Sequence, residues 1–428
     1  MSFLSENIIL ILSQRFLLPK ALTRPLFMLT SSLACIVPLA SINLPSVLYI
    51  AATTLFFLSL IVMLTRSDSA PLTGVEKLML ACWVVYPTFT AIDLWFRTGW
   101  DWVLFQEPSR FLLVLPIFLM VRRVGLSKQA IMWGVLAGAI VAGSYGIYQK
   151  QVLGFGRAAG GTSGLIAAFG DISLILGVMC VALIQPYWRN SKGWLLIAFL
   201  GLSLGVVGSL MSGTKGGWIS MPILCWLVVD LLEKPTYLKR FIVLISFVLL
   251  AVIVWYYVPF IEQRMSVIVP AIDEYFVNGK VVDGSAGIRL ALWHAATLIF
   301  IDNPLFGTGP GTYYIEKLEY INAGLIPSEA AGFTGPHSQL FESLFESGIF
   351  GPIMVYSIYF SFIWHCRKHF NQNKALSSAG VLMAAGFIDF GMVEVIWDIN
   401  NAGVFYTVMM VLIAGKLSFD RQYVTAIT

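Results

Sequence analysis

The sequence predicts an all-α polytopic integral membrane protein with about 12 transmembrane helices. Of its 428 residues, 58% are hydrophobic and 12% are charged, which is about half the charged share of a soluble domain. The mean hydropathy is +0.82, and apolar runs long enough to cross a bilayer recur along the whole chain. These observations exclude a soluble enzyme, a disordered chain and a coiled coil.

Each predicted span is an apolar run bounded by charged residues or by Pro and Gly breaks. The runs lie at 25–42, 45–65, 77–93, 109–121, 129–149, 164–185, 193–211, 216–233, 240–259, 338–364, 376–393 and 402–417. The run 109–121 is short for a hydrocarbon core of about 30 Å. The whole chain, 1–428, is predicted to form a single transmembrane domain.

One long hydrophilic segment, 260–337, separates the ninth predicted span from the tenth. It is too polar to cross a membrane and too rich in apolar positions to be a plain linker. Its middle part, Ile288–Ile301, has helical periodicity, and Asn303-Pro304 ends the pattern. The expected apolar face consists of Ile288, Leu292, Ala295 and Ile299. We expect this segment to form a large periplasmic helical loop that lies as a lid over the bundle.

The distribution of Lys and Arg predicts the orientation, because cytoplasmic segments carry an excess of these residues. With both termini in the cytoplasm, 18 of the 27 basic residues fall on the cytoplasmic side. The outer side keeps Arg97, Arg110, Lys150, Arg157, Lys215, Arg264, Lys280, Arg289 and Lys317. These outer cations run against the general bias, which suggests a separate reason for their placement.

Arg289 is predicted to lie in the first turn of a helix that Asp283, Gly284 or Ser285 can cap. A cation is unfavourable at this positive end of the helix dipole, so an anion bound beside Arg289 would explain its position. The alternative is that Arg289 pairs with Asp283 or reaches the lipid headgroups.

Three glycine-rich outer turns could also bind an anion. The first, Asn-Pro-Leu-Phe-Gly-Thr-Gly-Pro-Gly at 303–311, lacks the Gly-Lys-Ser/Thr of a Walker loop, so a plain turn between surface helices is favoured. The others carry Arg157, in 156–162, and Lys215, in 212–218. The alternatives are a flexible loop for Arg157 and a headgroup contact for Lys215.

His337 follows Gly335-Pro336 at the outer entrance of the tenth predicted span. Its imidazole titrates near neutrality, so it can take a proton from a sugar hydroxyl. The alternative is a capping or interfacial histidine. Glu342, five positions later, could orient His337 only if the histidine lies outside the helix.

Two smaller clusters complete the candidate set. Glu394 and Asp398 lie in the last outer loop, as a site for sugar hydroxyls or as solvated residues. His365, Cys366 and His369 have one possible metal-ligand spacing, but the basic residues between them disfavour a metal. The sequence therefore predicts no metal site and no cofactor.

Together these features resemble the O-antigen ligase family of bacterial envelope glycosyltransferases. The resemblance covers about 150–400 and depends on the order and spacing of the motifs. They are Arg157 with Ala-Ala-Gly, the Lys215 turn, Arg289 with Trp293, the 303–309 stretch, and His337 with Glu342 and Gly348. The family usually has arginine at the position of Lys215, and lysine keeps the charge but cannot form a bidentate fork to phosphate.

The resemblance implies a GT-C-like glycosyltransferase in the bacterial inner membrane. It would transfer a glycan from undecaprenyl diphosphate to a hydroxyl of lipid A–core oligosaccharide at the periplasmic face. The transfer would invert the anomeric carbon and need neither metal nor nucleotide. His337 and Arg289 would be catalytic, and Arg157, Lys215 and Arg289 would bind the diphosphate. Sugar or acceptor contacts would come from Trp293, Gln339, Glu342, Glu394 and Asp398.

Three other functions remain compatible with the sequence. An O-antigen polymerase uses the same donor but extends another lipid-linked repeat unit. A protein O-oligosaccharyltransferase often has a further outer domain, and none is visible. A transporter would call for broken helices near the bilayer midplane or for matched repeats, and we find no convincing repeat. No nucleic-acid partner is expected for any of them.

Overall fold

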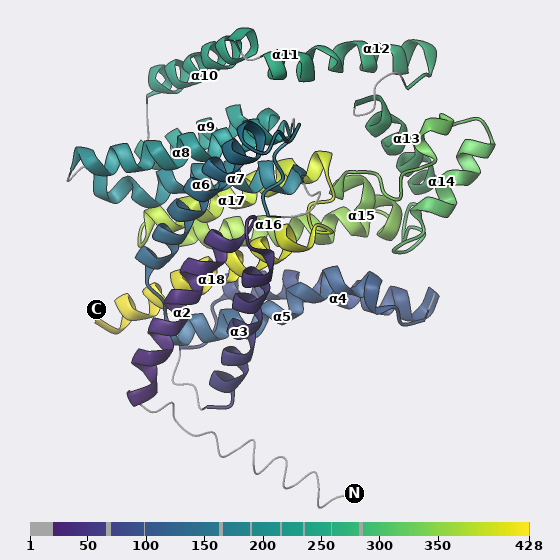
Figure 1. Ribbon diagram of the computed structural model, residues 1–428. Helices are drawn as coiled ribbons and strands as arrows, with labels where there is room; N and C mark the ends of the chain where they lie inside the picture. Colours follow the sequence, from purple (N-terminus) through teal and green to yellow (C-terminus); the bar gives the residue numbers. More distant parts are fainter. Residues whose placement is uncertain are drawn as a thin grey trace, which may run out of the picture.

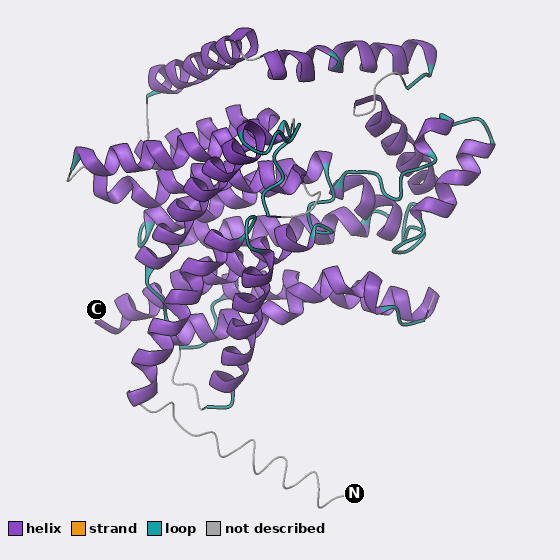
Figure 2. Cartoon of the chain, viewed as in Figure 1, coloured by secondary structure: helices purple, strands orange, loops and turns teal. Residues whose placement is uncertain are grey.

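The computed structural model describes residues 20–65, 70–97, 99–161, 166–188, 191–214, 216–233, 236–257, 259–281 and 286–427. These residues form helices and loops and contain no strand (Figure 2). Nine of the described helices are long and apolar enough to cross a membrane. The predicted fold class, an all-α polytopic membrane protein, is confirmed.

The long helices follow the predicted spans in order. They are α2 (Lys20–Ala40), α3 (Pro45–Met63), α4 (Gly74–Arg97), α5 (Trp102–Val124), α6 (Lys128–Gln151), α7 (Ile166–Trp188), α8 (Lys192–Ser212), α9 (Gly216–Glu233), α10 (Tyr237–Tyr257), α16 (Phe350–Lys368), α17 (Lys374–Val393) and α18 (Asn400–Ile427). In Figure 1, α7, α17 and α18 run through the middle of the bundle. Accordingly, 83% of the apolar window of both α7 and α18 is buried.

Helix α5 is longer than its predicted run of 109–121. It begins at Trp102 because the Asp101 carboxylate accepts hydrogen bonds from the amides of Val103, at 2.8 Å, and Leu104, at 3.4 Å. It ends at Val124, before Gly125 with a φ of +76°. Its 23 residues span about 34 Å, enough for the hydrocarbon core.

The predicted span 338–364 was wrong as one continuous helix. The chain instead forms the short helix α15 (Gln339–Ser347), breaks, and continues as α16. Gly348 makes the break with a φ of +59°, and a Cβ atom there would lie 2.3 Å from the Leu305 carbonyl oxygen. The Ile349 amide donates to the Pro304 carbonyl at 2.9 Å. The glycine-rich turn therefore lies against the break.

The segment between α10 and α15, which we call the outer segment, builds a second, smaller hydrophobic core. The helices of this segment are α11 (Pro259–Ser266), α12 (Ile268–Asn278), α13 (Ala286–Asp302), α14 (Tyr313–Asn322) and the short turn η1 (Ser328–Ala330). The predicted apolar face of α13 is buried and packs against Tyr313, Ile326, Ala330 and Phe345 of α15. We call this cluster the outer core. In Figure 1, α13 and α14 lie at the right of the bundle, opposite the C-terminus.

A buried lysine fixes the chain that leads from the outer core to His337. Lys317 of α14 is fully buried, and its Nζ donates hydrogen bonds to the carbonyls of Ala330, at 2.7 Å, Ala331, at 3.3 Å, and Phe333. Burial lowers the pKa of Lys317 to about 8, so the ammonium form still predominates at pH 7. In the sequence this residue looked like any outer cation, because nothing local signals its burial.

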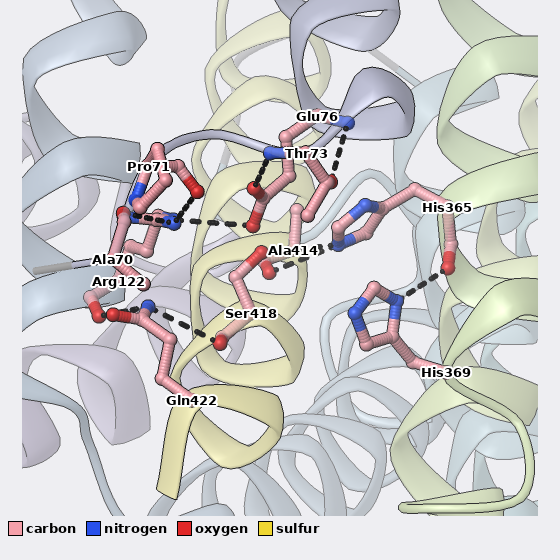
Figure 3. A network of polar contacts seen from close by, with 10 residues as sticks. All are labelled: Ala70, Pro71, Thr73, Glu76, Arg122, His365, His369, Ala414, Ser418 and Gln422. Carbon is pink, nitrogen blue, oxygen red and sulfur yellow. Dashed lines mark hydrogen bonds and ion pairs between the residues drawn. The ribbon is translucent and has the colours of Figure 1, made fainter. Parts of the chain in front are cut away.

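A polar network joins four helices at the opposite end of the bundle (Figure 3). Buried Glu76 of α4 pairs with buried Arg122 of α5 at 3.1 Å. His365 Nε2 lies 3.2 Å from the Ala414 carbonyl of α18. His369, the C-cap residue of α16, has its Nδ1 2.8 Å from the carbonyl of His365 in the last turn of that helix. We call this group the inner polar network.

Candidate active site

His337 has an unusual backbone conformation. Its φ is +50°, the only positive φ at a non-glycine residue in the described part of the chain. Such a conformation is uncommon away from glycine and often marks a functional position. It lies directly before Ser338, the N-cap residue of α15, so the histidine is outside the helix. This geometry aims the imidazole away from the direction that a helical residue would take.

Glu394, not Glu342, holds the His337 ring. His337 Nδ1 lies 2.8 Å from Glu394 Oε1. Glu394 is the C-cap residue of α17, and its backbone is extended. Its side chain is mostly buried, with 17% exposed, whereas 39% of the His337 side chain is exposed. Since 57 residues separate the two groups in the chain, local spacing gave no signal of this pair.

Arg289 reaches the same carboxylate from the outer segment. It lies in the first turn of α13, as predicted. Its Nε donates to the Val393 carbonyl at 3.1 Å, and a terminal nitrogen lies 3.8 Å from Glu394 Oε2. Val393 is the last residue of α17, so the guanidinium also neutralises the negative end of that helix dipole. The three candidates Asp283, Gly284 and Ser285 lie outside the described residues.

A chain of contacts brings the Arg157 loop toward this corner. Arg157 Nε donates to the Ser212 carbonyl at 2.6 Å, at the end of α8. Gly216, which begins α9, packs so closely on Val393 that an added Cβ would lie 2.4 Å from that side chain. Val393 in turn accepts the hydrogen bond from Arg289. Lys215 itself lies outside the described residues.

A cavity of about 500 Å³ opens beside His337. Its lining comes from the start of α3, the loop after α6, the loop before α15, α15 itself, the turn between α17 and α18, and the start of α18. The lining residues are Pro45, Tyr49, Gly161, Thr334, Gly335, His337, Glu342, Glu394, Val395, Asp398, Ile399, Asn400 and Asn401. Of the predicted site residues, the cavity therefore brings together His337, Glu342, Glu394 and Asp398.

Carboxyl groups crowd one side of this cavity. Burial and the neighbouring charges of Asp398 and Glu346 hold the pKa of Glu342 well above its ordinary value. Burial and Asp398 likewise raise the pKa of Glu346 to about 8. One oxygen of Glu342 is buried and has no hydrogen-bond partner among the described residues. At neutral pH this wall can donate hydrogen bonds as well as accept them.

Trp293 and Gln339 are placed differently from the other candidates. The Trp293 ring stacks on Phe341 of α15, with centroids 5.3 Å apart, and thereby ties α13 to α15. Gln339 is buried, and its side-chain oxygen accepts a hydrogen bond from the Trp397 amide at 3.3 Å. Neither residue lines the cavity. Their contacts position the walls of the site.

The glycine-rich turn uses its amides for packing. The Thr308 amide donates to the Phe345 carbonyl at 2.8 Å, and the Gly309 amide donates to the Glu346 carbonyl at 3.0 Å. These are the last carbonyls of α15, which a helix cannot satisfy internally. The interpretation as a turn between surface helices therefore agrees with the structure better than a phosphate loop does.

An apolar recess of about 300 Å³ lies next to the cavity between α3, α5 and α18. Tyr49 lines both spaces, whereas Arg110 of α5 lines the recess and bonds to Asn400 of the cavity lining. Arg110 is buried, and its guanidinium donates to the Trp397 carbonyl at 2.5 Å and to the Asn400 side chain. From the sequence, Arg110 was predicted to be one of the outer cations but not a residue of the site. A buried arginine in a span is itself a signal of function.

Residues 200–356 match the family model described as O-antigen ligase. The matched range includes Arg289, the glycine-rich turn, His337 and Glu342, which supports the O-antigen ligase family. A Haemophilus influenzae protein described as "Uncharacterized protein" is 22% identical over 308 residues, which cover 70% of this chain and 76% of that protein. The family match, 200–356, extends over the outer segment.

Proposed function

We propose that the chain is an O-antigen ligase of the inner membrane, because residues 200–356 match the family model described as O-antigen ligase. It would transfer a glycan from undecaprenyl diphosphate to a hydroxyl of lipid A–core oligosaccharide at the periplasmic face, in lipopolysaccharide biosynthesis. The observation that carries the proposal is the 2.8 Å contact between His337 and Glu394, which both line the cavity. Arg289 contacts the same Glu394 carboxylate.

His337 acts as the general base in this proposal. Its Nδ1 is engaged by Glu394, so Nε2 is the nitrogen available to an acceptor hydroxyl. The hydroxyl proton moves to Nε2 while the oxygen attacks the anomeric carbon of the donor. The bond from that carbon to the diphosphate breaks, and the electron pair leaves with undecaprenyl diphosphate. Glu394 stabilises the imidazolium that forms, and direct displacement inverts the anomeric carbon.

The basic residues stabilise the leaving diphosphate. Arg289 is held by one carbonyl and by a long ion pair of 3.8 Å, so an incoming diphosphate can replace the weaker contact. Arg157 and Lys215 complete the anion site from the neighbouring loops. Cations that meet the charge developing in the transition state contribute most to such a reaction.

The polyprenyl chain has a place beside this site. The apolar recess between α3, α5 and α18 shares Tyr49 with the cavity, and Arg110 of its lining bonds to Asn400 of the cavity lining. An amphipathic donor needs this arrangement, since its tail is apolar and its headgroup is doubly charged. In this proposal the recess holds the part of the polyprenyl chain next to the diphosphate, and Arg110 contacts the diphosphate.

The carboxyl wall receives the sugars. Glu342 and Asp398 line the cavity, and carboxyl groups commonly bind sugar hydroxyls. Glu394 has the more direct task of orienting His337. Trp293 and Gln339, which lie outside the lining, would support the acceptor side through Phe341 and Trp397.

The test is a transfer assay with purified protein in detergent. Undecaprenyl-diphosphate glycan is supplied with and without lipid A–core, in EDTA and without nucleotide. Product that forms only with lipid A–core supports the ligase and its independence from metal and nucleotide. Chain growth from the donor alone would establish an O-antigen polymerase instead. No product in either reaction, with intact donor, would contradict both transferase functions.

A further inference from the structure

Another cavity, of about 730 Å³, lies at the end of the bundle opposite His337. It is formed by the ends of α2, α6, α7, α17 and α18 and by the turn before α6. The lining residues are Phe27, Leu126, Ser127, Lys128, Gln129, Pro186, Gln372, Asn373, Lys374, Ala375, Lys416, Phe419 and Asp420. We call it the inner cavity. None of its residues belongs to the site described above.

The lining of the inner cavity carries excess positive charge. It contains three lysines, Lys128, Lys374 and Lys416, and one acidic residue, Asp420. Asp420 is already engaged, because Lys416 Nζ lies 2.6 Å from its Oδ1 and Asn373 Nδ2 donates to its Oδ2 at 3.0 Å. The lining as a whole therefore has a formal net charge of +2, from three lysines and one aspartate.

Two helices also begin at this cavity. Lys128 is the first residue of α6 and Lys374 is the first residue of α17, and neither helix has an acidic residue in its first turn. A lysine at the positive end of a helix dipole is unfavourable unless an anion lies nearby. At α6, Ser127 makes no capping hydrogen bond to the helix, which leaves the first amides without that side-chain partner, whereas the Asn373 side chain caps α17.

The rest of the lining is apolar and lies at the ends of the spans. Phe27, Leu126, Pro186 and Phe419 form this part, beside helices of membrane-spanning length. A free inorganic anion would gain nothing from these side chains. An anion attached to acyl chains would contact both parts of the lining. Basic pockets between transmembrane helices commonly bind lipid headgroups in this way.

We propose that the inner cavity binds the phosphate headgroup of an anionic phospholipid. The phosphate contacts Lys128, Lys374 and the first amides of α6, and the acyl chains leave past Phe27 and Phe419. The bound lipid joins α2, α6, α17 and α18 at the end of the bundle that holds the C-terminus (Figure 1). A ligand that binds the folded protein alone raises its stability by mass action.

The experiment uses the delipidated full-length protein in a neutral detergent. Thermal unfolding and native mass spectrometry are measured with phosphatidylglycerol, with phosphatidylcholine and with inorganic phosphate. We expect phosphatidylglycerol to bind and to raise the unfolding temperature, with little effect from the other two. Equal stabilisation by inorganic phosphate would make this a free-anion site, and equal stabilisation by phosphatidylcholine would remove the role of charge. Either result overturns the proposal.

The double variant Lys128→Gln/Lys374→Gln tests the assignment to this cavity. It should bind phosphatidylglycerol about thirtyfold more weakly, because each lysine near a headgroup contributes on the order of 1 kcal/mol. Lys192→Gln is the matched control, since Lys192 is exposed at the start of α8 but does not line the cavity. Binding that is unchanged in the double variant, or equally weakened in the control, contradicts the proposal.

Discussion

The two ends of the bundle both combine histidine, carboxylate and arginine, but they arrange these groups differently. In the inner polar network the Glu76–Arg122 pair is 3.1 Å long and buried, and His365 is fully buried. At the outer end the Glu394–Arg289 contact is 3.8 Å long, and 39% of the His337 side chain is exposed beside a cavity. The first arrangement joins helices, and the second leaves its groups able to meet a ligand.

The histidines at the two ends of the bundle differ in their surroundings. The inner histidines bond to the backbone of α16 and α18, and burial lowers the pKa of His369, which keeps it neutral. His337 instead has a charged partner and a strained backbone. Accessibility and a positioned partner, more than the presence of histidine, indicate catalysis.

Removal of the outer histidine should have the largest effect on transfer. We expect His337→Ala to slow transfer by about 100- to 10,000-fold, the usual range for a general base, while the amount of protein in the membrane stays unchanged. The measurement is the initial rate with purified protein. His294→Ala is the control, because His294 is exposed on α13 and pairs with Tyr275. Near-normal transfer by His337→Ala would remove this residue from the mechanism.

Loss of the outer arginine should come next. Arg289→Ala should reduce transfer by about 100- to 1000-fold, as for other donors to a transition-state charge. Arg289→Lys should recover part of the rate, because it restores the charge without the fork. Exposed Lys280 provides the control Lys280→Ala. If the loss of transfer in Arg289→Ala were fully explained by a loss of folded protein, the residue would serve only to cap α17.

The inner pair should show the reverse pattern. Glu76→Ala leaves a buried arginine without its partner, which typically costs about 3–5 kcal/mol of stability. We expect a lower unfolding temperature and less protein in the membrane, with a normal transfer rate per folded molecule. Lys77→Ala, at the exposed neighbouring position, should change neither. A slower transfer rate per folded molecule in Glu76→Ala would contradict a purely structural role for the inner pair.

The smallest effect should be a pH dependence from the outer carboxyl wall. The pKa of Glu346 is raised to about 8, so the folded protein keeps this proton at pH values where the unfolded chain has lost it. Its contribution to stability is therefore complete below about pH 4.5 and disappears as the pH rises through 8. Thermal unfolding between pH 5 and 9 should show falling stability, and Glu346→Gln should flatten the slope. If Glu346→Gln kept the same decrease of unfolding temperature with pH as the unmodified protein, Glu346 would not be its cause.

Sequence patterns located most helices because each span is an apolar run of sufficient length. They misplaced the start of α5, since that helix includes Glu107 and Pro108, which come directly before the predicted run of 109–121. They also missed the break at Gly348, because the run on either side of it stays apolar. The break depends on the turn near Leu305, more than 40 residues earlier, which no local window includes.

The candidate site was predictable in part for similar reasons. His337 and Arg289 stood out as a histidine after Gly-Pro and a cation at a helix start. The partner Glu394 was only one of two carboxyl groups in a loop, because its bond to His337 spans 57 residues. The buried states of Arg110 and Lys317 arise from tertiary packing, so neither could be told from a surface cation.

The separate outer core has a consequence for how the effects of substitutions combine. No residue belongs to both the outer core and the main core of the bundle in the described ranges. Substitutions in cores without shared partners change stability almost independently. Substitutions confined to the outer core should therefore change stability largely independently of substitutions in the main core. The exceptions are the links between the two parts, such as Arg289 with Val393 and Ile349 with Pro304, where the two sets of substitutions should be coupled.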